Sequence, residues 1–354
     1  MKRHGFIMAV VACLAACIST LPASPRFHWP APTTQPGTPT ETFSCKDVPL
    51  EMRGASGELA GWLRAFEPKP EQFDYTLQRL DEDDAIIVYR LAYPSAFKTP
   101  WPENNTVPAE FYLPKSVSGK MPAAIVLDIM DGSAIIARGM ARGLAENGIA
   151  ALYVPMAYYG PRRPRGDPHL RVLAADPTRT LDAMRQTVMD IRRAKAILAS
   201  RPNIDPAHIG ITGVSLGGIM TSLAAGVDGT FDRIVPILAG GDLAALVFHT
   251  RETRAIRQKL QAAGITRAQL EKMLAPVEPL NFAARIDPAR CLMINAATDE
   301  VIPRWTTDAL NKAIGTPRIL WSPAGHYSSI LYLPTIRQTA ERFLKGQKVE
   351  KLGF

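Results

Sequence analysis

A serine framed by glycines is the feature of this sequence whose residue types and spacing could do chemistry. Ser215 stands within Gly213-Val214-Ser215-Leu216-Gly217, after a short β-type run and before a run that can start a helix. A strand, a sharp turn and a helix form the setting of a Gly-x-Ser-x-Gly nucleophile elbow, where main-chain N–H groups at the helix start can bind an oxyanion. An isolated match is also compatible with a packing turn, so the serine needs partners.

The partners of a nucleophilic serine are a base and an acid that orients the base. Among six histidines, His326 directly follows the last predicted strand. Asp299 follows the strand predicted at 292–295, and the adjacent Glu300 is the alternative acid. The order Ser215, Asp299, His326, each at the C-terminal end of a successive strand, is typical of serine hydrolases that carry a catalytic triad on a parallel sheet.

The elements that must position these residues alternate between strands and helices. Runs rich in Val, Ile and Tyr alternate with helical patterns, which predicts an α/β fold with a mostly parallel sheet and helices on both faces. About eight strands are expected, the first two as an antiparallel edge. Their ranges are 85–91, 107–113, 123–127, 150–154, 209–212, 234–238, 292–295 and 318–321.

Helices are expected at 134–147 and 181–200, where apolar residues recur at helical spacing. Residues 244–284, after the sixth predicted strand, are too many for a simple crossover and predict a small helical excursion. Two polar helices are expected within it, at 252–263 and 266–274, and the excursion could form a cap over a pocket.

The N-terminal residues 1–17 predict a lipoprotein-type signal peptide. Two basic residues precede an apolar run too short to span a bilayer, and Leu14-Ala15-Ala16-Cys17 resembles a bacterial lipobox, whose cysteine is lipidated. Cleavage after Ala23 is the alternative. Residues 18–45, rich in Pro and Thr, predict a tether, and residues 46–354 a single domain. We therefore expect an exported bacterial protein of the cell envelope, lipid-anchored at Cys17 or periplasmic.

Composition excludes several other classes. The chain of 354 residues is 47% hydrophobic, which suffices for one large core. Its net charge of +8 comes from scattered Lys and Arg, so no nucleic-acid partner is predicted. The sequence has no ligand-spaced metal cluster and no dinucleotide fingerprint, so neither metal nor cofactor is expected.

Cys45 and Cys291 could pair in an oxidising compartment, but we prefer the interpretation that they do not. No oligomeric state is predicted.

The sequence resembles the α/β-hydrolase superfamily, most closely its dienelactone hydrolase and acetyl xylan esterase-like branches. The resemblance runs from about residue 85 to the C-terminus and rests on GITGVSLGG, INAATDEVIP and GHY. It implies that Ser215 is the nucleophile, Asp299 the orienting acid and His326 the general base. It also implies main-chain oxyanion donors at Leu216 and at Ile129, with Met130 as the alternative to Ile129. Dienelactone hydrolases carry cysteine as the nucleophile, so lactone hydrolysis is not implied.

The segment MAYYGPRRPRG follows the strand at 150–154 on the same sheet edge as the serine. Tyr158, Tyr159, Arg162 and Arg163 are therefore candidates to line the substrate site, where arginine would suit a carboxylate or phosphate. The alternative is a turn at Gly160 with exposed arginines.

Together these observations predict a serine carboxylic-ester hydrolase that acts through an acyl-enzyme. Its substrate would be an ester in the cell envelope or an extracellular carbohydrate ester. The alternatives are a non-catalytic envelope binding module on the same fold, or a serine peptidase.

Overall fold

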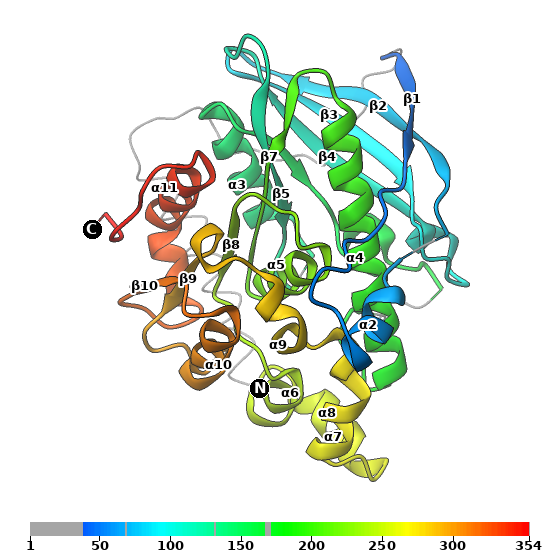
Figure 1. Ribbon diagram of the computed structural model, residues 1–354, viewed down its shortest axis with the longest axis vertical. Coiled ribbons are helices and arrows are strands. Elements are labelled where there is room, and N and C mark those ends of the chain that lie inside the picture. The colour runs from blue at the N-terminus through cyan, green and yellow to red at the C-terminus, as the bar shows by residue number, and fades with distance from the viewer. Residues whose placement is uncertain (1–37, 68, 131, 167–170, 354) are drawn as a thin grey trace, which may run out of the picture. The chain divides into compact units, whose positions relative to one another are not determined.

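The computed structural model describes residues 38–353, apart from residues 68, 131 and 167–170 (Figure 1). The predicted signal peptide, its Cys17 and most of the predicted tether lie outside the described residues and stay predictions. Within the described part of the chain, every helix is too short or too polar to cross a membrane.

One twisted sheet runs through the described residues, in the strand order β1-β2-β3-β4-β6-β5-β7-β8-β9-β10. The first four strands pair antiparallel, and β4 pairs antiparallel with β6. The remaining neighbours in the sheet, β6-β5-β7-β8-β9-β10, all pair parallel. The strands are β1 (Thr40–Lys46), β2 (Gln72–Glu82), β3 (Ile86–Pro94), β4 (Thr106–Pro114), β5 (Met121–Leu127), β6 (Ala150–Tyr153), β7 (Ile204–Val214), β8 (Ile234–Ile237), β9 (Leu292–Ala296) and β10 (Arg318–Ser322). The predicted mostly parallel sheet is confirmed, with ten strands rather than eight.

The two strands that sequence analysis missed widen the antiparallel edge. β1 takes up the last residues of the predicted tether 18–45, so the tether prediction is wrong from Thr40 onward. Most of β1 is exposed because it is the outermost strand, and its sequence therefore lacks a buried apolar face. The sequence of β2 does carry the alternating pattern of a half-buried strand, because the buried Phe73, Tyr75 and Leu77 alternate with more exposed residues.

Helices cover both faces of the parallel strands. On one face, α3 (Ile135–Glu146) packs on β5 and β6 and contacts α11 (Leu333–Leu344), which packs on β8 and β9. On the other face, α4 (Pro177–Ser200) and α5 (Leu216–Asp228) pack against each other and on β7. Helices α2 (Gly57–Arg64) and α10 (Arg304–Ile314) complete the layers. Because both faces are covered, β6, β8 and β9 are buried along their whole length.

The predicted helical excursion lies between β8 and β9. Its helices are α6 (Leu243–His249), α7 (Arg254–Ala262), α8 (Arg267–Leu274) and the short α9 (Pro279–Phe282). The ranges of α7 and α8 match the two predicted helices, and α8 packs against α6 and α4. Figure 1 shows α6, α7 and α8 beyond the edge at which the parallel strands end.

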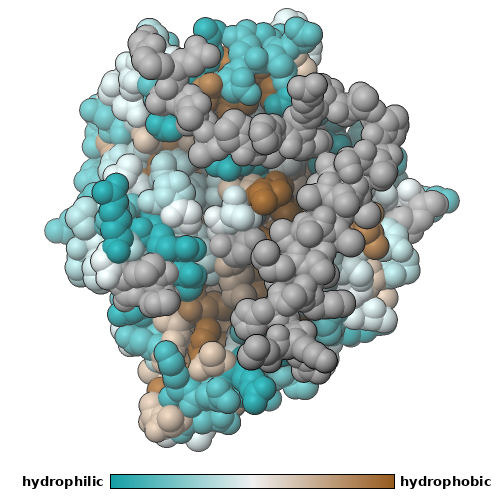
Figure 2. Space-filling model, turned by 180° about the vertical axis from the view of Figure 1, so that it is seen from behind, coloured by the Kyte–Doolittle hydropathy of each residue, from teal (hydrophilic) through white to brown (hydrophobic). Residues whose placement is uncertain are grey.

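The face turned away from the viewer in Figure 1 is largely hydrophilic where it is described, with separate hydrophobic areas (Figure 2). Cys45 and Cys291 are both buried and unpaired in the structure. Burial raises the pKa of both thiols.

Candidate active site

Ser215 occupies the sharp turn between β7 and α5. Its φ of 57° and ψ of −117° are strained for a residue with a side chain, and its N–H donates to the carbonyl of Ile237 at 2.9 Å. The flanking glycines are required by packing. A Cβ at Gly213 would lie 2.5 Å from the carbonyl oxygen of Gly217, and a Cβ at Gly217 would lie 2.5 Å from that of Asp128. The turn therefore has the strand–turn–helix geometry of a nucleophile elbow.

A continuous chain of hydrogen bonds joins the three residues that the sequence singled out. His326 Nε2 lies 3.0 Å from Ser215 Oγ, and His326 Nδ1 lies 2.9 Å and 3.1 Å from the two carboxylate oxygens of Asp299. A carboxylate only accepts, so Nδ1 donates to Asp299 and Nε2 is left to accept from the serine hydroxyl. The side chains of His326 and Asp299 are only 10% and 2% exposed, which strengthens the interaction.

The adjacent carboxylates of Asp299 and Glu300 act on different parts of the histidine. Asp299 Oδ1 also accepts from the N–H groups of Val301 and Ile302, at 2.9 Å and 2.7 Å, which fixes the carboxylate. Glu300 accepts from the main-chain N–H of His326 at 2.8 Å. The structure thus brings Asp299, and not the alternative Glu300, to the imidazole ring.

The predicted oxyanion donors lie on two neighbouring segments. Leu216 is the first residue of α5, where main-chain N–H groups have no partner within the helix. Ile129 lies in the loop between β5 and α3, and the carbonyls of Leu127 and Asp128 in this region lie against Gly217. The loop that carries Ile129 therefore borders the elbow.

Sequence reasoning missed the role of Asp128 in this loop. Its buried carboxylate accepts from the N–H of Ala134 at 2.7 Å and from that of Ala137 at 3.4 Å. It therefore binds the unpaired N–H groups at the start of α3, as a capping side chain does. Asp128 lies six positions before Ala134, too far for the local N-cap pattern, so the sequence carried no signal for this role.

The prediction that Arg162 binds substrate or is exposed is wrong. Its side chain is fully buried and donates to Asp190 at 2.7 Å, to the carbonyl of Pro155 at 3.0 Å and to that of Asn104 at 2.8 Å. An arginine so far from water requires these partners, because an unpaired buried charge is strongly unfavourable. Tyr158 and Tyr159 are only 5% and 2% exposed, so these two candidate substrate residues are also packed inside the protein. Arg163 is partly exposed and stays a candidate.

The excursion touches the loop that carries the histidine. Tyr327 Oη donates to Glu252 Oε1 at 2.8 Å, and Glu252 lies in the turn between α6 and α7. A second contact joins the His249 and Trp305 rings, whose centroids are 6.0 Å apart. The excursion therefore borders the site, and its action as a cap stays a prediction.

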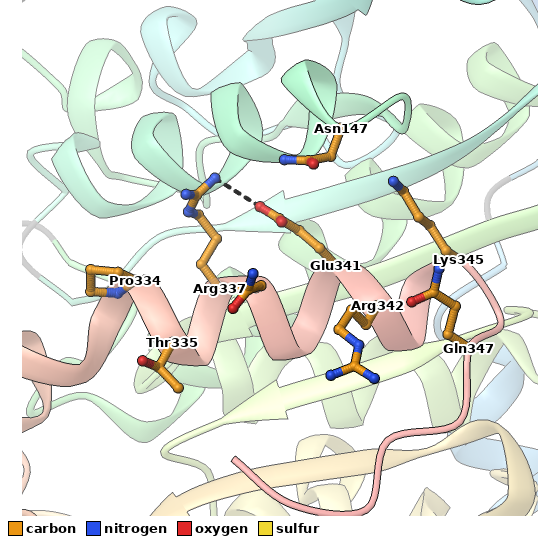
Figure 3. A pocket seen from close by; sticks show the side chains of 9 residues that line it. Asn147, Pro334, Thr335, Arg337, Glu341, Arg342, Lys345 and Gln347 are labelled. Carbon is orange, nitrogen blue, oxygen red and sulfur yellow. Dashed lines mark hydrogen bonds and ion pairs between the residues drawn. The ribbon is translucent and has the colours of Figure 1, made fainter. Parts of the chain in front are cut away.

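Two surface hollows lie away from the serine. One, of about 380 Å³, lies along α11 beside the end of α3, with the Arg337–Glu341 ion pair and Lys345 on its wall (Figure 3). The other, of about 210 Å³, lies at the end of α5, beside Arg53 and Arg285. Both hollows lie beside the N-terminal ends of strands. Ser215 follows the C-terminal end of β7, so neither hollow is at the serine. In the part of the chain that the structure describes, no group of three His, Cys, Asp or Glu side chains is placed to hold a metal ion.

The sheet order, the elbow and the hydrogen-bonded triad geometry together define an α/β-hydrolase fold, as the sequence predicted. The chain also matches the family model "Alpha/beta hydrolase domain containing 18" over residues 57–253, more than half of its length. The protein belongs to this family of α/β hydrolases. The matched range includes Ser215 and ends before Asp299 and His326. None of the curated proteins searched matches the sequence.

Solved structures show the same fold at low sequence identity. The acetyl xylan esterase from Paenibacillus sp. R4 is 21% identical, with a TM-score of 0.63 over 77% of this chain and 89% of that chain. Acetyl xylan esterase 1 from Thermoanaerobacterium sp. JW/SL YS485 is 18% identical, with a TM-score of 0.60 over 78% and 92%. The acylaminoacyl peptidase of Pyrococcus horikoshii is 14% identical, with a TM-score of 0.52 over 80% and 49%.

Proposed function

We propose that this protein is a serine hydrolase that cleaves carboxylic esters through an acyl-enzyme. The observation that carries the proposal is the unbroken hydrogen-bonded chain from Asp299 through His326 to the hydroxyl of Ser215. A serine hydroxyl is a weak nucleophile at neutral pH, and an oriented imidazole that accepts its proton removes that barrier. The strained elbow adds support, because such strain persists mainly where it serves a site.

In the first half-reaction, Ser215 Oγ attacks the ester carbonyl carbon and its proton passes to His326 Nε2. Asp299 stabilises the imidazolium that forms. The negative charge on the carbonyl oxygen is bound by the N–H groups of Leu216 and Ile129. His326 then donates the proton to the leaving alcohol as its C–O bond breaks, which leaves the acyl group on the serine. Water attacks that ester, gives its proton to His326, and the acid is released as the hydroxyl re-forms.

A small acyl group on a carbohydrate is the substrate class that we favour. Two solved structures of the same fold are acetyl xylan esterases. The excursion beside the site also lacks the composition of a lipid groove, because α7 (RAIRQKLQA) and α8 (RAQLEKML) are rich in charged and amide side chains and bury few apolar residues. A long acyl chain would need an apolar surface to leave water.

A fluorophosphonate probe tests for an activated serine in the purified full chain. The matched control is Ser222→Ala, because Ser222 lies buried in the same helix and its hydroxyl donates to the carbonyl of Gly218. Labelling of the wild type and of Ser222→Ala, with none in Ser215→Ala, would support the proposal. A folded wild type without labelling would contradict it and favour the non-catalytic binding module.

Hydrolysis assays then separate esterase from peptidase. We expect turnover of p-nitrophenyl acetate and acetylated xylan oligosaccharides, falling as the acyl chain lengthens. Faster cleavage of peptide amides than of esters would instead identify a serine peptidase.

The cellular location is proposed on the sequence motif at Cys17. Lipidation there would hold the enzyme at a membrane surface, near envelope or extracellular carbohydrate esters. We expect Cys17→Ser to move the protein from the membrane fraction to the soluble fraction and to abolish labelling with radioactive palmitate. Unchanged fractionation and labelling would contradict a lipid anchor at this residue.

A further inference from the structure

We propose that Tyr159, held by the buried Arg162–Asp190 ion pair, is a positioning residue for the oxyanion-binding loop between β5 and α3. The proposal rests on the proposed function, because it takes the N–H of Ile129 in this loop as an oxyanion donor. It assigns a role to a segment in which Arg162 is buried and cannot contact the substrate.

The Tyr159 ring lies directly against the main chain of this loop at Gly132. A Cβ at Gly132 would lie 2.8 Å from Tyr159 Cδ1 and 3.1 Å from Tyr159 Cβ, so the contact leaves no room for a methyl group. Gly132 has a φ of +68°, which also favours glycine. The adjacent Gly160 also lies close to this loop, with its Cβ position 3.6 Å from the carbonyl oxygen of Gly132.

The start of the loop, at Leu127 and Asp128, is fixed by the nucleophile elbow. The carbonyl oxygens of Leu127 and Asp128 lie 2.8 Å and 2.5 Å from the Cβ position of Gly217. The carboxylate of Asp128 closes the loop by accepting from the N–H of Ala134. The main chain of the loop therefore has a close contact near each end, with Gly217 at Asp128 and with the Tyr159 ring at Gly132. A shift of the tyrosine ring would be passed to the loop that holds Ile129.

The tyrosine is held in turn by the buried arginine. The main-chain N–H of Arg162 donates to the carbonyl of Tyr159 at 3.0 Å, and the Arg162 guanidinium binds three acceptors on three segments, which fixes the turn that carries the tyrosine. One of these acceptors is Asp190 on α4, which itself is fully buried. A planar guanidinium with several fixed hydrogen bonds sets orientation more tightly than a flexible ammonium would.

Kinetics of four variants test this positioning role. Gly132→Ala pushes a methyl group into the tyrosine ring, and Tyr159→Leu removes the ring. Tyr159→Phe keeps the ring. Gly148→Ala is the matched control, because Gly148 also has a positive φ, of +82°, but its Cβ would only touch Val117 at 3.5 Å.

We expect Gly132→Ala and Tyr159→Leu to lower kcat about 10- to 100-fold with KM within about threefold, because a misplaced oxyanion donor weakens binding of the transition state alone. Gly148→Ala should match the wild type, and Tyr159→Phe should lose no more than about threefold, since the ring is kept. Affinity for a trifluoromethyl ketone, whose hemiketal oxyanion uses the same donors, should fall by the same factor as kcat/KM. A purely structural role would lower Tm without this parallel loss.

The outcomes separate this proposal from the proposed function. If the wild type hydrolyses esters and both Gly132→Ala and Tyr159→Leu match Gly148→Ala, the positioning role is wrong and the esterase stands. If the wild type neither reacts with the fluorophosphonate nor hydrolyses esters, the proposed function is wrong and the positioning role falls with it. Should Tyr159→Leu fail to fold, Gly132→Ala decides, because its packing change is confined to one methyl group.

Discussion

Glu300 accepts a hydrogen bond from the main-chain N–H of His326, so this carboxylate holds the histidine loop rather than the imidazole ring. A Cβ at the preceding Gly325 would lie 2.5 Å from Glu300 Oε2, which shows how closely the loop wraps the side chain. Asp299, one residue earlier, faces the ring at Nδ1. Two adjacent carboxylates therefore have different partners on one histidine.

Substitution of these two carboxylates should have very different effects. We expect Asp299→Asn to lower kcat about 10³- to 10⁴-fold, because an amide no longer stabilises the imidazolium and favours the wrong tautomer. Glu300→Gln should lower kcat less than about 10-fold, because the amide oxygen can still accept from the main chain. Steady-state hydrolysis of p-nitrophenyl acetate measures both. A larger loss in Glu300→Gln than in Asp299→Asn would make Glu300 the orienting acid.

The two buried cysteines should stay unreactive while the protein is folded. Burial raises the pKa of the thiols of Cys45 and Cys291, so little thiolate forms near neutral pH. We expect iodoacetamide to leave both unmodified in native protein and to alkylate both after denaturation without reductant, as read by mass spectrometry. A peptide linked through the two cysteines in the non-reduced digest would contradict the free-thiol assignment.

The meeting of Ser215, Asp299 and His326 could be predicted because each follows the end of a strand. Parallel neighbours bring their C-terminal ends to one sheet edge, so chain order and strand positions place the residues together. The parallel strands are short buried apolar runs between helices, which is a strong pattern. The outer strand β1 could not be found in this way, because an exposed edge strand needs no apolar face.

The burial of Arg162 could not be predicted from its local sequence. An arginine next to Gly160, Pro161 and Arg163 is typical of an exposed turn. Its partner Asp190 lies 28 positions away on the inward face of α4, and its other acceptors are main-chain carbonyls. Hydrogen bonds to carbonyls depend on tertiary packing and leave no mark in the residue types.

Loss of the buried arginine should destabilise the fold. We expect Arg162→Leu to lower the free energy of unfolding by about 3–5 kcal/mol, because it leaves Asp190 without its charge partner in the core. The control is Arg165→Leu in the same segment, an exposed residue whose replacement should change the free energy by less than about 0.5 kcal/mol. Urea unfolding followed by circular dichroism measures both. Equal losses of unfolding free energy in the two variants would mean that the Arg162–Asp190 ion pair makes no specific contribution to stability.

The destabilisation of Arg162→Leu should also depend on pH. Burial raises the pKa of Asp190 and the charge of Arg162 opposes that rise, so removal of the arginine raises this pKa further. As pH rises above about 3.9, the unfolded chain loses this proton first while the folded variant keeps it up to its raised pKa. Between these two values the folded state binds more protons, so its stability falls as pH rises. The loss in free energy of unfolding of Arg162→Leu relative to wild type should therefore be larger at about pH 7.5 than at about pH 5.

Urea unfolding of the wild type, Arg162→Leu and the double variant Arg162→Leu/Asp190→Asn at these pH values checks this sign. In the double variant the carboxyl is absent, so its deficit in the free energy of unfolding should not grow as pH rises. A deficit of Arg162→Leu that is the same at both pH values, or that grows on acidification, would show that ionised Asp190 is not the source of the instability.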